Sequence, residues 1–84
     1  MNEKILAEIY VPAAGESYDV WIPKSLRIRD LVMLLSEALS SLVQGQFQGN
    51  PGTGLFWRES GELLDMNRTV RALGLENGAE LMLI

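Results

Sequence analysis

The chain contains no cysteine and no histidine among its 84 residues. Without cysteine, neither disulfides nor thiolate metal sites can form. The absence of histidine removes the commonest general base and the commonest metal ligand, which argues against most hydrolytic and metal-dependent enzymes. We therefore expect a non-enzymatic protein that has no catalytic residues, no metal and no other cofactor.

Basic residues and long hydrophobic runs are also scarce. Seven Lys and Arg residues stand against eleven Asp and Glu residues, which gives a formal net charge of −4. Phosphate-backbone binding needs clustered basic residues, so nucleic acid is not an expected partner. The longest apolar run, residues 31–35, is far shorter than the ~20 residues of a transmembrane helix. A secretory signal is not expected either, because Glu8 interrupts the short apolar stretch that follows Lys4. We expect a cytoplasmic protein that reaches the inner face of the membrane only through a partner.

The length is that of one small domain, residues 1–84, and 48% apolar residues suffice for one core. Residues 4–11 and 17–22 alternate between apolar and polar side chains with the period of two that is typical of strands. Pro12 to Glu16 form a turn between them. Pro23 ends the second strand, because proline cannot donate to a continuing ladder. This pattern predicts an antiparallel hairpin.

A helical period follows the hairpin. The apolar stripe, spaced at ~100° per residue, comprises Ile28, Leu31, Val32, Leu35, Ala38, Leu39, Leu42 and Val43. Ser25 is the predicted N-terminal cap. We expect the stripe to pack on the hairpin.

The remaining segments are shorter. Gln44 to Gly54 is rich in Gly, Gln and Asn and predicts a loop, and residues 55–64 predict a second hairpin whose turn is residues 59–61. Thr69 can cap a helical turn, and Asn77 begins the turn into the last strand, residues 80–84.

The resulting order is ββαββ with a short helical turn before the last strand. It predicts an α+β protein with the ubiquitin-like β-grasp fold, in which a mixed four- to five-stranded sheet packs on one long helix.

Strand pleating also predicts an exposed apolar face. If Ile5 and Leu81 face the helix, residues of the opposite parity lie on the outer side of the sheet. Either Phe56 or Trp57 joins them, depending on register. The predicted protein-interaction residues are Trp21, Phe56, Met82, Ile84 and Leu6. Adjoining aromatic and aliphatic side chains of this kind indicate an interaction patch, with Trp21 as its anchor. The alternative is that the chain's own termini or loop cover this face.

Two further groups of residues are candidate sites. Glu59 and Glu62 flank Ser60, but without a neighbouring base this pattern favours a solvated turn over a nucleophile. Arg68 and Arg71 offer guanidinium groups to a partner's carboxylate, although solvated surface positions are the simpler interpretation.

One set of apolar and turn residues extends over nearly the whole chain: Tyr18 to Ile22, Pro23, Leu26, Ile28, Leu31, Leu35, Leu64, Arg68, Thr69, Val70, Leu73, Gly74, Leu75, Gly78, Leu81 and Leu83. Through these residues the chain resembles the YukD/EsaB family, small ubiquitin-like proteins of bacterial type VII (WXG100) secretion systems, and it is also similar to the cytosolic ubiquitin-like domain of the membrane component EccD. The resemblance implies a supporting role in secretion, through binding to a component of the machinery or to a second copy.

Two other classes remain open. The runner-up is a small β-grasp structural subunit of a multicomponent di-iron monooxygenase, which has a similar length. A covalent modifier or sulfur carrier needs a C-terminal Gly-Gly, whereas this sequence ends on Ile84. We therefore expect binding and not conjugation.

Overall fold

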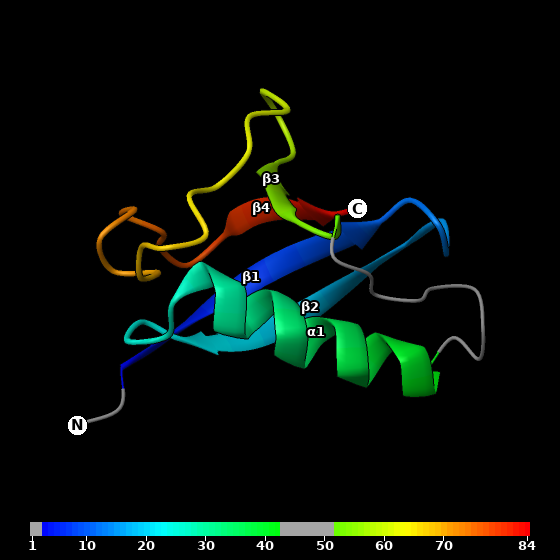
Figure 1. The fold of residues 1–84 in the computed structure, drawn as a ribbon, viewed down its shortest axis with the longest axis horizontal. Coiled ribbons are helices and arrows are strands. Elements are labelled where there is room, and N and C mark those ends of the chain that lie inside the picture. Colours follow the sequence, from blue (N-terminus) through cyan, green and yellow to red (C-terminus); the bar gives the residue numbers. More distant parts are fainter. Residues whose placement is uncertain (1–2, 43–51) are drawn as a thin grey trace.

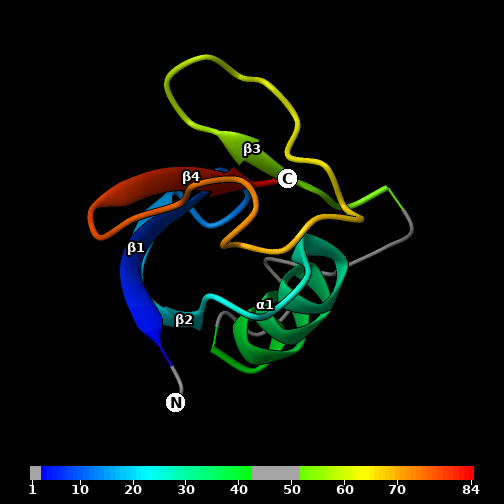
Figure 2. The ribbon, with the colours of Figure 1, turned by 90° about the vertical axis from the view of Figure 1, so that its left-hand side faces the viewer.

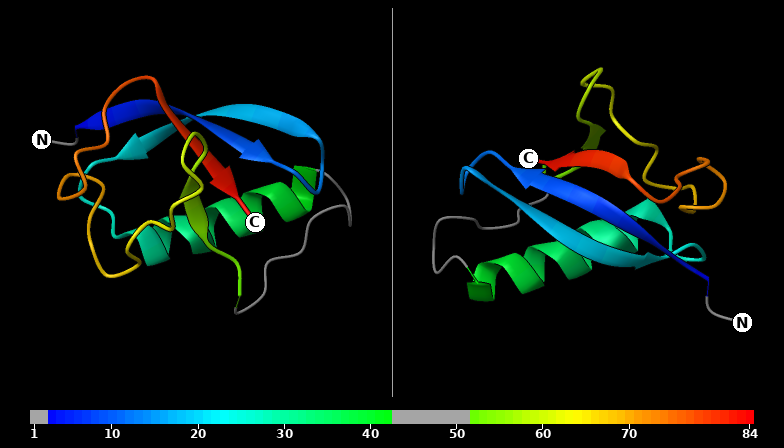
Figure 3. Two further views of the ribbon diagram at one scale, coloured as in Figure 1. Left: turned by 90° about the horizontal axis from the view of Figure 1, so that it is seen from above. Right: turned by 180° about the vertical axis from the view of Figure 1, so that it is seen from behind.

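The computed structural model describes residues 3–42 and 52–84. Its elements follow the predicted ββαββ order (Figure 1). They are β1 (Lys4–Val11), β2 (Glu16–Pro23), α1 (Ile28–Leu42), β3 (Leu55–Trp57) and β4 (Ala79–Leu83). The strands form one mixed sheet in the order β2-β1-β4-β3, and α1 crosses one face of it (Figure 3). The predicted β-grasp is confirmed.

The sheet has four strands. β1 pairs antiparallel with β2 and parallel with β4, while β3 pairs antiparallel with β4. The predicted second hairpin forms, since the Trp57 N–H donates to the Glu62 carbonyl at 2.9 Å. The second half of this hairpin, residues 62–64, forms only the isolated bridge between Phe56 and Leu63, so no fifth strand is present in the described part of the chain.

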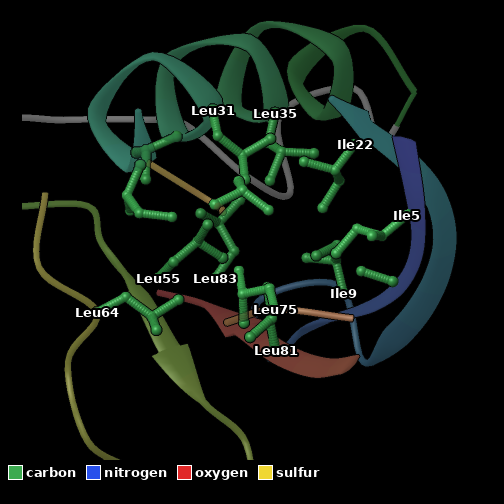
Figure 4. Close-up of a cluster of buried hydrophobic side chains, with 14 of the residues drawn as sticks. Ile5, Ile9, Ile22, Leu31, Leu35, Leu55, Leu64, Leu75, Leu81 and Leu83 are labelled. Carbon is green, nitrogen blue, oxygen red and sulfur yellow. The ribbon is translucent and has the colours of Figure 1, made fainter. Parts of the chain in front are cut away.

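The core lies between α1 and the sheet. Figure 4 shows side chains of the helix, among them Leu31 and Leu35, pointing toward Ile9, Leu81 and Leu83 of the strands. The largest fully buried side chains are Ile5, Ile9, Ile22, Ile28, Leu55, Leu64, Leu75, Leu81, Leu83, Val11 and Val70. The apolar side chains of the strands therefore pack against the apolar stripe of the helix, as the two sequence periods predict.

The stripe is narrower than predicted. Ala38 is exposed, because it lies ~80° from Ile28 around the helix, at the margin of the buried stripe. Val43, the side chain of Leu42 and most of the predicted loop Gln44 to Gly54 lie outside the part that is described. No helix in residues 3–42 and 52–84 is long and apolar enough to cross a membrane.

The start of α1 is bound by a distant segment. The N–H groups of Ile28 and Arg29 donate to the carbonyls of Arg68 and Met66, at 2.9 and 3.1 Å. These backbone acceptors satisfy donors that every helix leaves free in its first turn. The predicted cap at Ser25 is therefore wrong, because tertiary contacts supply the acceptors.

The entry into β4 is fixed by its predicted turn residues. The Thr69 hydroxyl accepts the Ala72 N–H at 3.0 Å, and Gly74 follows the turn with a φ of 72°, a conformation that suits glycine. Further on, the Asn77 side-chain oxygen accepts the Leu6 N–H at 2.8 Å, and the Gly78 N–H donates to the Leu6 carbonyl at 2.8 Å. These two bonds bind the start of β4 to β1.

Replacing Asn77 with Ala removes the acceptor for the Leu6 N–H. We expect the Asn77→Ala variant to lose about 1 kcal/mol of unfolding free energy in urea denaturation. Asn77→Asp retains a side-chain oxygen and should lose markedly less. Equal losses in both variants would contradict this role for the oxygen.

The two tryptophans should report different environments. Trp21 is 62% exposed, whereas Trp57 is half-buried against the core. We expect Trp21→Phe to remove the longer-wavelength, iodide-quenched part of the indole fluorescence and Trp57→Phe to remove the shorter-wavelength part. The opposite assignment would show that the β3 register is incorrect.

Candidate protein-interaction site

The candidate site is the face of the sheet that points away from α1. Figure 2 shows α1 lying to one side of the curved sheet, and no helix of the described ranges covers the other side. Trp21 and Ile84 on this face are 62% and 54% exposed. Leu6, Phe56 and Met82 are half-buried. All five predicted interaction residues therefore retain accessible side-chain surface.

Strand register arranges the side chains of this face in rows. Residues paired across neighbouring strands point to the same side of a sheet. Tyr10 of β1 pairs with Met82 of β4, and Met82 pairs with Phe56 of β3. Phe56 is in turn bridged to Leu63. Tyr10, Met82, Phe56 and Leu63 thus form one line across the sheet, which we call the apolar row.

The register also decides between the two aromatic residues of β3. Phe56 lies opposite Met82 and joins the outer face, whereas Trp57 lies opposite the buried Leu81 and packs against the core. The sequence left this choice open, and Phe56 is the member of the site.

Ile84 extends the apolar row along β4. Its backbone exchanges two hydrogen bonds with Gly54, at 2.8 and 3.1 Å. A Cβ at position 54 would lie 3.1 Å from Cδ1 of Leu63 and 3.6 Å from Cε1 of Phe56. Glycine at this position therefore lets the Leu63 and Phe56 side chains approach the backbone opposite Ile84.

A charged row lies beside the apolar row. Glu8 of β1 pairs with Asp19 of β2 and with Glu80 of β4. Arg58 reaches across from the end of β3, where its Nη1 lies 2.9 Å from Oε1 of Glu8 and its Cζ lies 4.5 Å from the centre of the Tyr10 ring. The charged row thus holds three carboxylates and one guanidinium group.

Trp21 and Leu6 form a separate pair beyond the charged row. They are directly opposite each other in the β1–β2 register. Leu6 precedes Tyr10 by four residues in β1, a distance of ~13 Å along an extended strand. The five predicted residues therefore fall into two groups, with Phe56, Met82 and Ile84 on one side of the charged row and Trp21 and Leu6 on the other.

Sequence reasoning missed Tyr10, Leu63 and Arg58 as members of the site. The period-two alternation placed Tyr10 on the same face as Leu6, so the signal for it was present. Leu63 and Arg58 join only through pairing across the second hairpin, and no local pattern fixes that pairing.

The other candidate groups form no reactive centre. Glu59, Ser60 and Glu62 are exposed in the turn after β3, where the Ser60 hydroxyl accepts the Glu62 N–H at 3.2 Å. Together with Trp57 they line a shallow hollow of about 330 Å³. Within residues 3–42 and 52–84, no three acidic side chains are grouped so that they could hold a metal ion.

Arg68 and Arg71 are exposed and paired within the chain. Nε of Arg68 lies 3.8 Å from Oδ2 of Asp65, and Nη2 of Arg71 lies 3.1 Å from Oε1 of Glu3. Exposed pairs of this kind contribute at most about 1 kcal/mol. They are the solvated surface positions that the simpler interpretation predicted.

Solved ubiquitin-like structures share this fold. The ubiquitin-like domain of the Mycobacterium tuberculosis type VII secretion system protein ECCD1 superposes with a TM-score of 0.78 at 12% identity, covering 98% of each chain. The UBL domain of yeast Ddi1 gives 0.72 at 20% identity over 99% of this chain and 90% of that one. A structure described as "Molecular Mimicry of SUMO promotes DNA repair" gives a TM-score of 0.74 at 19% identity, covering 100% of this chain and 94% of that one. At these identities the likeness shows the fold alone.

The sequence itself identifies the family. No curated protein sequence matches the chain significantly. A family model described as "WXG100 protein secretion system (Wss), protein YukD" matches residues 6–83, which is nearly the whole chain. The chain therefore belongs to the YukD family of the WXG100 protein secretion system.

Proposed function

We propose that this protein is a non-enzymatic accessory protein of a type VII (WXG100) secretion system. It acts by docking the outer sheet face, without covalent conjugation, on another protein of the secretion machinery. The family match supports the pathway. The alternative as a monooxygenase subunit draws no support from that match.

The apolar row is the observation that carries the proposal. Tyrosine, phenylalanine and methionine are enriched at the cores of protein interfaces, and here they line up from β1 to β3 with accessible surface. Burying these side chains stabilises a complex by about 25 cal/mol per Å² of apolar area, less the cost of association. A partner that covers this row and Ile84 gains several such side chains at once.

The charged row determines which partner fits. Asp19, Glu8 and Glu80 outnumber Arg58, so a complementary surface presents Lys or Arg beside an apolar strip. Face-to-face packing of two copies would bring these carboxylates close together in a chain with a net charge of −4. This favours a different protein over a second copy. A partner in the membrane machinery would hold this protein at the inner face of the membrane.

Phe56→Ser tests the apolar row. An affinity-tagged variant in the native cell should recover at least tenfold less of the type VII secretion proteins than the unmodified chain does, a change that corresponds to about 1.4 kcal/mol. Quantitative mass spectrometry of the bound proteins measures this. Met33→Ser is the matched control, because Met33 is an exposed apolar residue of α1. A folded Phe56→Ser variant with undiminished recovery would contradict the proposal.

Trp21→Ala tests whether the second apolar group belongs to the same interface. A standard interface covers about 800 Å² on each partner, enough to span the ~13 Å between the two groups. We expect recovery of the secretion proteins to fall about tenfold while the thermal midpoint stays within a few degrees of the parent. Loss of the folded state would show instead that Trp21 supports the core.

A further inference from the structure

The free edge of the sheet is β2. In the order β2-β1-β4-β3, β2 is hydrogen-bonded to β1 on one side only. It has eight residues, whereas β3 at the opposite edge has three. A long exposed edge presents unpaired backbone donors and acceptors to other chains.

Strand alternation identifies the outward backbone groups. Leu6 directs its N–H and its carbonyl toward β4, because they bond to Asn77 and Gly78. The backbone N–H and carbonyl groups of even-numbered residues of β1 therefore point toward β4, and those of odd-numbered residues point toward β2. In the register of the hairpin, these odd-numbered residues pair with even-numbered residues of β2. The backbone groups of Ser17, Asp19 and Trp21 consequently point away from the sheet, and they have no hydrogen-bond partner in the described part of the chain.

Apolar surface lies beneath this edge. Tyr18 and Val20 point inward from β2, yet both are only half-buried. On α1, Leu34 is 49% exposed and Ala38 is also exposed. The apolar side chains on the inner face of β2 and on this flank of α1 thus keep surface that another apolar side chain can contact.

The helical period places Leu34 and Ala38 on the β2 side of α1. Arg29 hydrogen-bonds to Asn67 and, through its N–H, to the Met66 carbonyl, so its flank of the helix faces the segment between β3 and β4. At ~100° per residue, Leu34 and Ala38 lie on the opposite flank of the buried stripe. Figure 2 shows β2 on that opposite side of α1.

We propose that the β2 edge binds an extended segment of a protein partner as a fifth strand, and that this segment alternates apolar and basic residues. The backbone N–H and carbonyl groups of Ser17, Asp19 and Trp21 hydrogen-bond to the extended backbone of this segment. Its inward side chains pack over Tyr18 and Val20 and against Leu34. This site is distinct from the apolar row, and it does not depend on the function proposed above.

Charge selects the segment. β2 contains Glu16 and Asp19 and no Lys or Arg, and Glu8 lies directly beside Asp19 on β1. Side chains of an added strand that point to the outer face lie next to Asp19, so Lys and Arg fit there and Asp and Glu do not. Glu16 has the parity of Tyr18 and lies on the helix side of β2, where it adds to the negative charge of the edge. Two β2 edges from two copies would bring like charges together, which is destabilising across strands. The occupant is therefore a basic segment of another protein and not a second copy.

Titration of the ¹⁵N-labelled protein with a synthetic peptide of alternating Lys and Val tests the proposal. We expect amide shifts centred on Ser17, Asp19 and Trp21, with hydrogen exchange at these amides slowed at least tenfold. An alternating Glu and Val peptide of equal length is the matched control and should bind at least tenfold more weakly. Equal binding of the two peptides, shifts centred on Phe56 and Met82, or no shifts at all would overturn the proposal.

Substitutions at Asp19 and Leu34 separate the contribution of backbone hydrogen bonds to peptide affinity from that of apolar contacts. Asp19→Pro removes an N–H that points away from β1, so the β1–β2 ladder remains and peptide affinity should fall at least tenfold. Asp19→Asn keeps that N–H and should bind more tightly than Asp19→Pro. If Asp19→Pro fails to fold, Leu34→Gln tests the proposal instead, because it alters only an exposed position of the helix.

Leu34→Gln should weaken the Lys and Val peptide at least fivefold, whereas Met33→Gln, another exposed position of α1, should leave its affinity unchanged. Phe56→Ser should also leave it unchanged, which separates this site from the apolar row. Equal affinities of the Leu34→Gln and Met33→Gln variants would overturn the placement of the strand beside α1.

Discussion

The parallel pairing of β1 with β4 is the constraint on which the rest of the structure depends. It brings the end of the chain beside its beginning, and the Asn77 side chain and the Gly78 N–H bind that junction to Leu6. Side chains alternate along a strand, so a slip of one residue would turn Leu81 and Leu83 out of the core and Met82 into it. One register therefore sets both the core and the candidate binding face.

The same register also arranges the side chains of the outer face. Tyr10 and Met82 share one row and Glu8 and Glu80 share the next, so apolar and acidic side chains form adjacent lines and not a mixture. In the proposed complex, the apolar line provides affinity and the neighbouring carboxylates reject partners that carry like charge. The proposed adaptor role thus uses side chains on the face of the sheet opposite the core.

The sequence predicted the elements with strong periods and failed where distant segments meet. The first hairpin, the long helix and the last strand each repeat their period several times. By contrast, β3 has three residues, too few to fix whether Phe56 or Trp57 faces outward. The Ser25 cap was wrong because the carbonyls of Arg68 and Met66, far along the chain, bind the helix start. The division of the predicted site by the charged row also required the pairing of distant strands.

Contacts between side chains in solution test the central claim most directly. In the NMR spectrum of the unbound protein, the Met82 methyl group should show nuclear Overhauser effects to the rings of both Tyr10 and Phe56, its neighbours in the apolar row. It should show none to the indole of Trp21, which lies beyond the charged row. Strong effects between Met82 and Trp21, or between Met82 and the Trp57 ring in place of Phe56, would contradict the register and the binding face built on it.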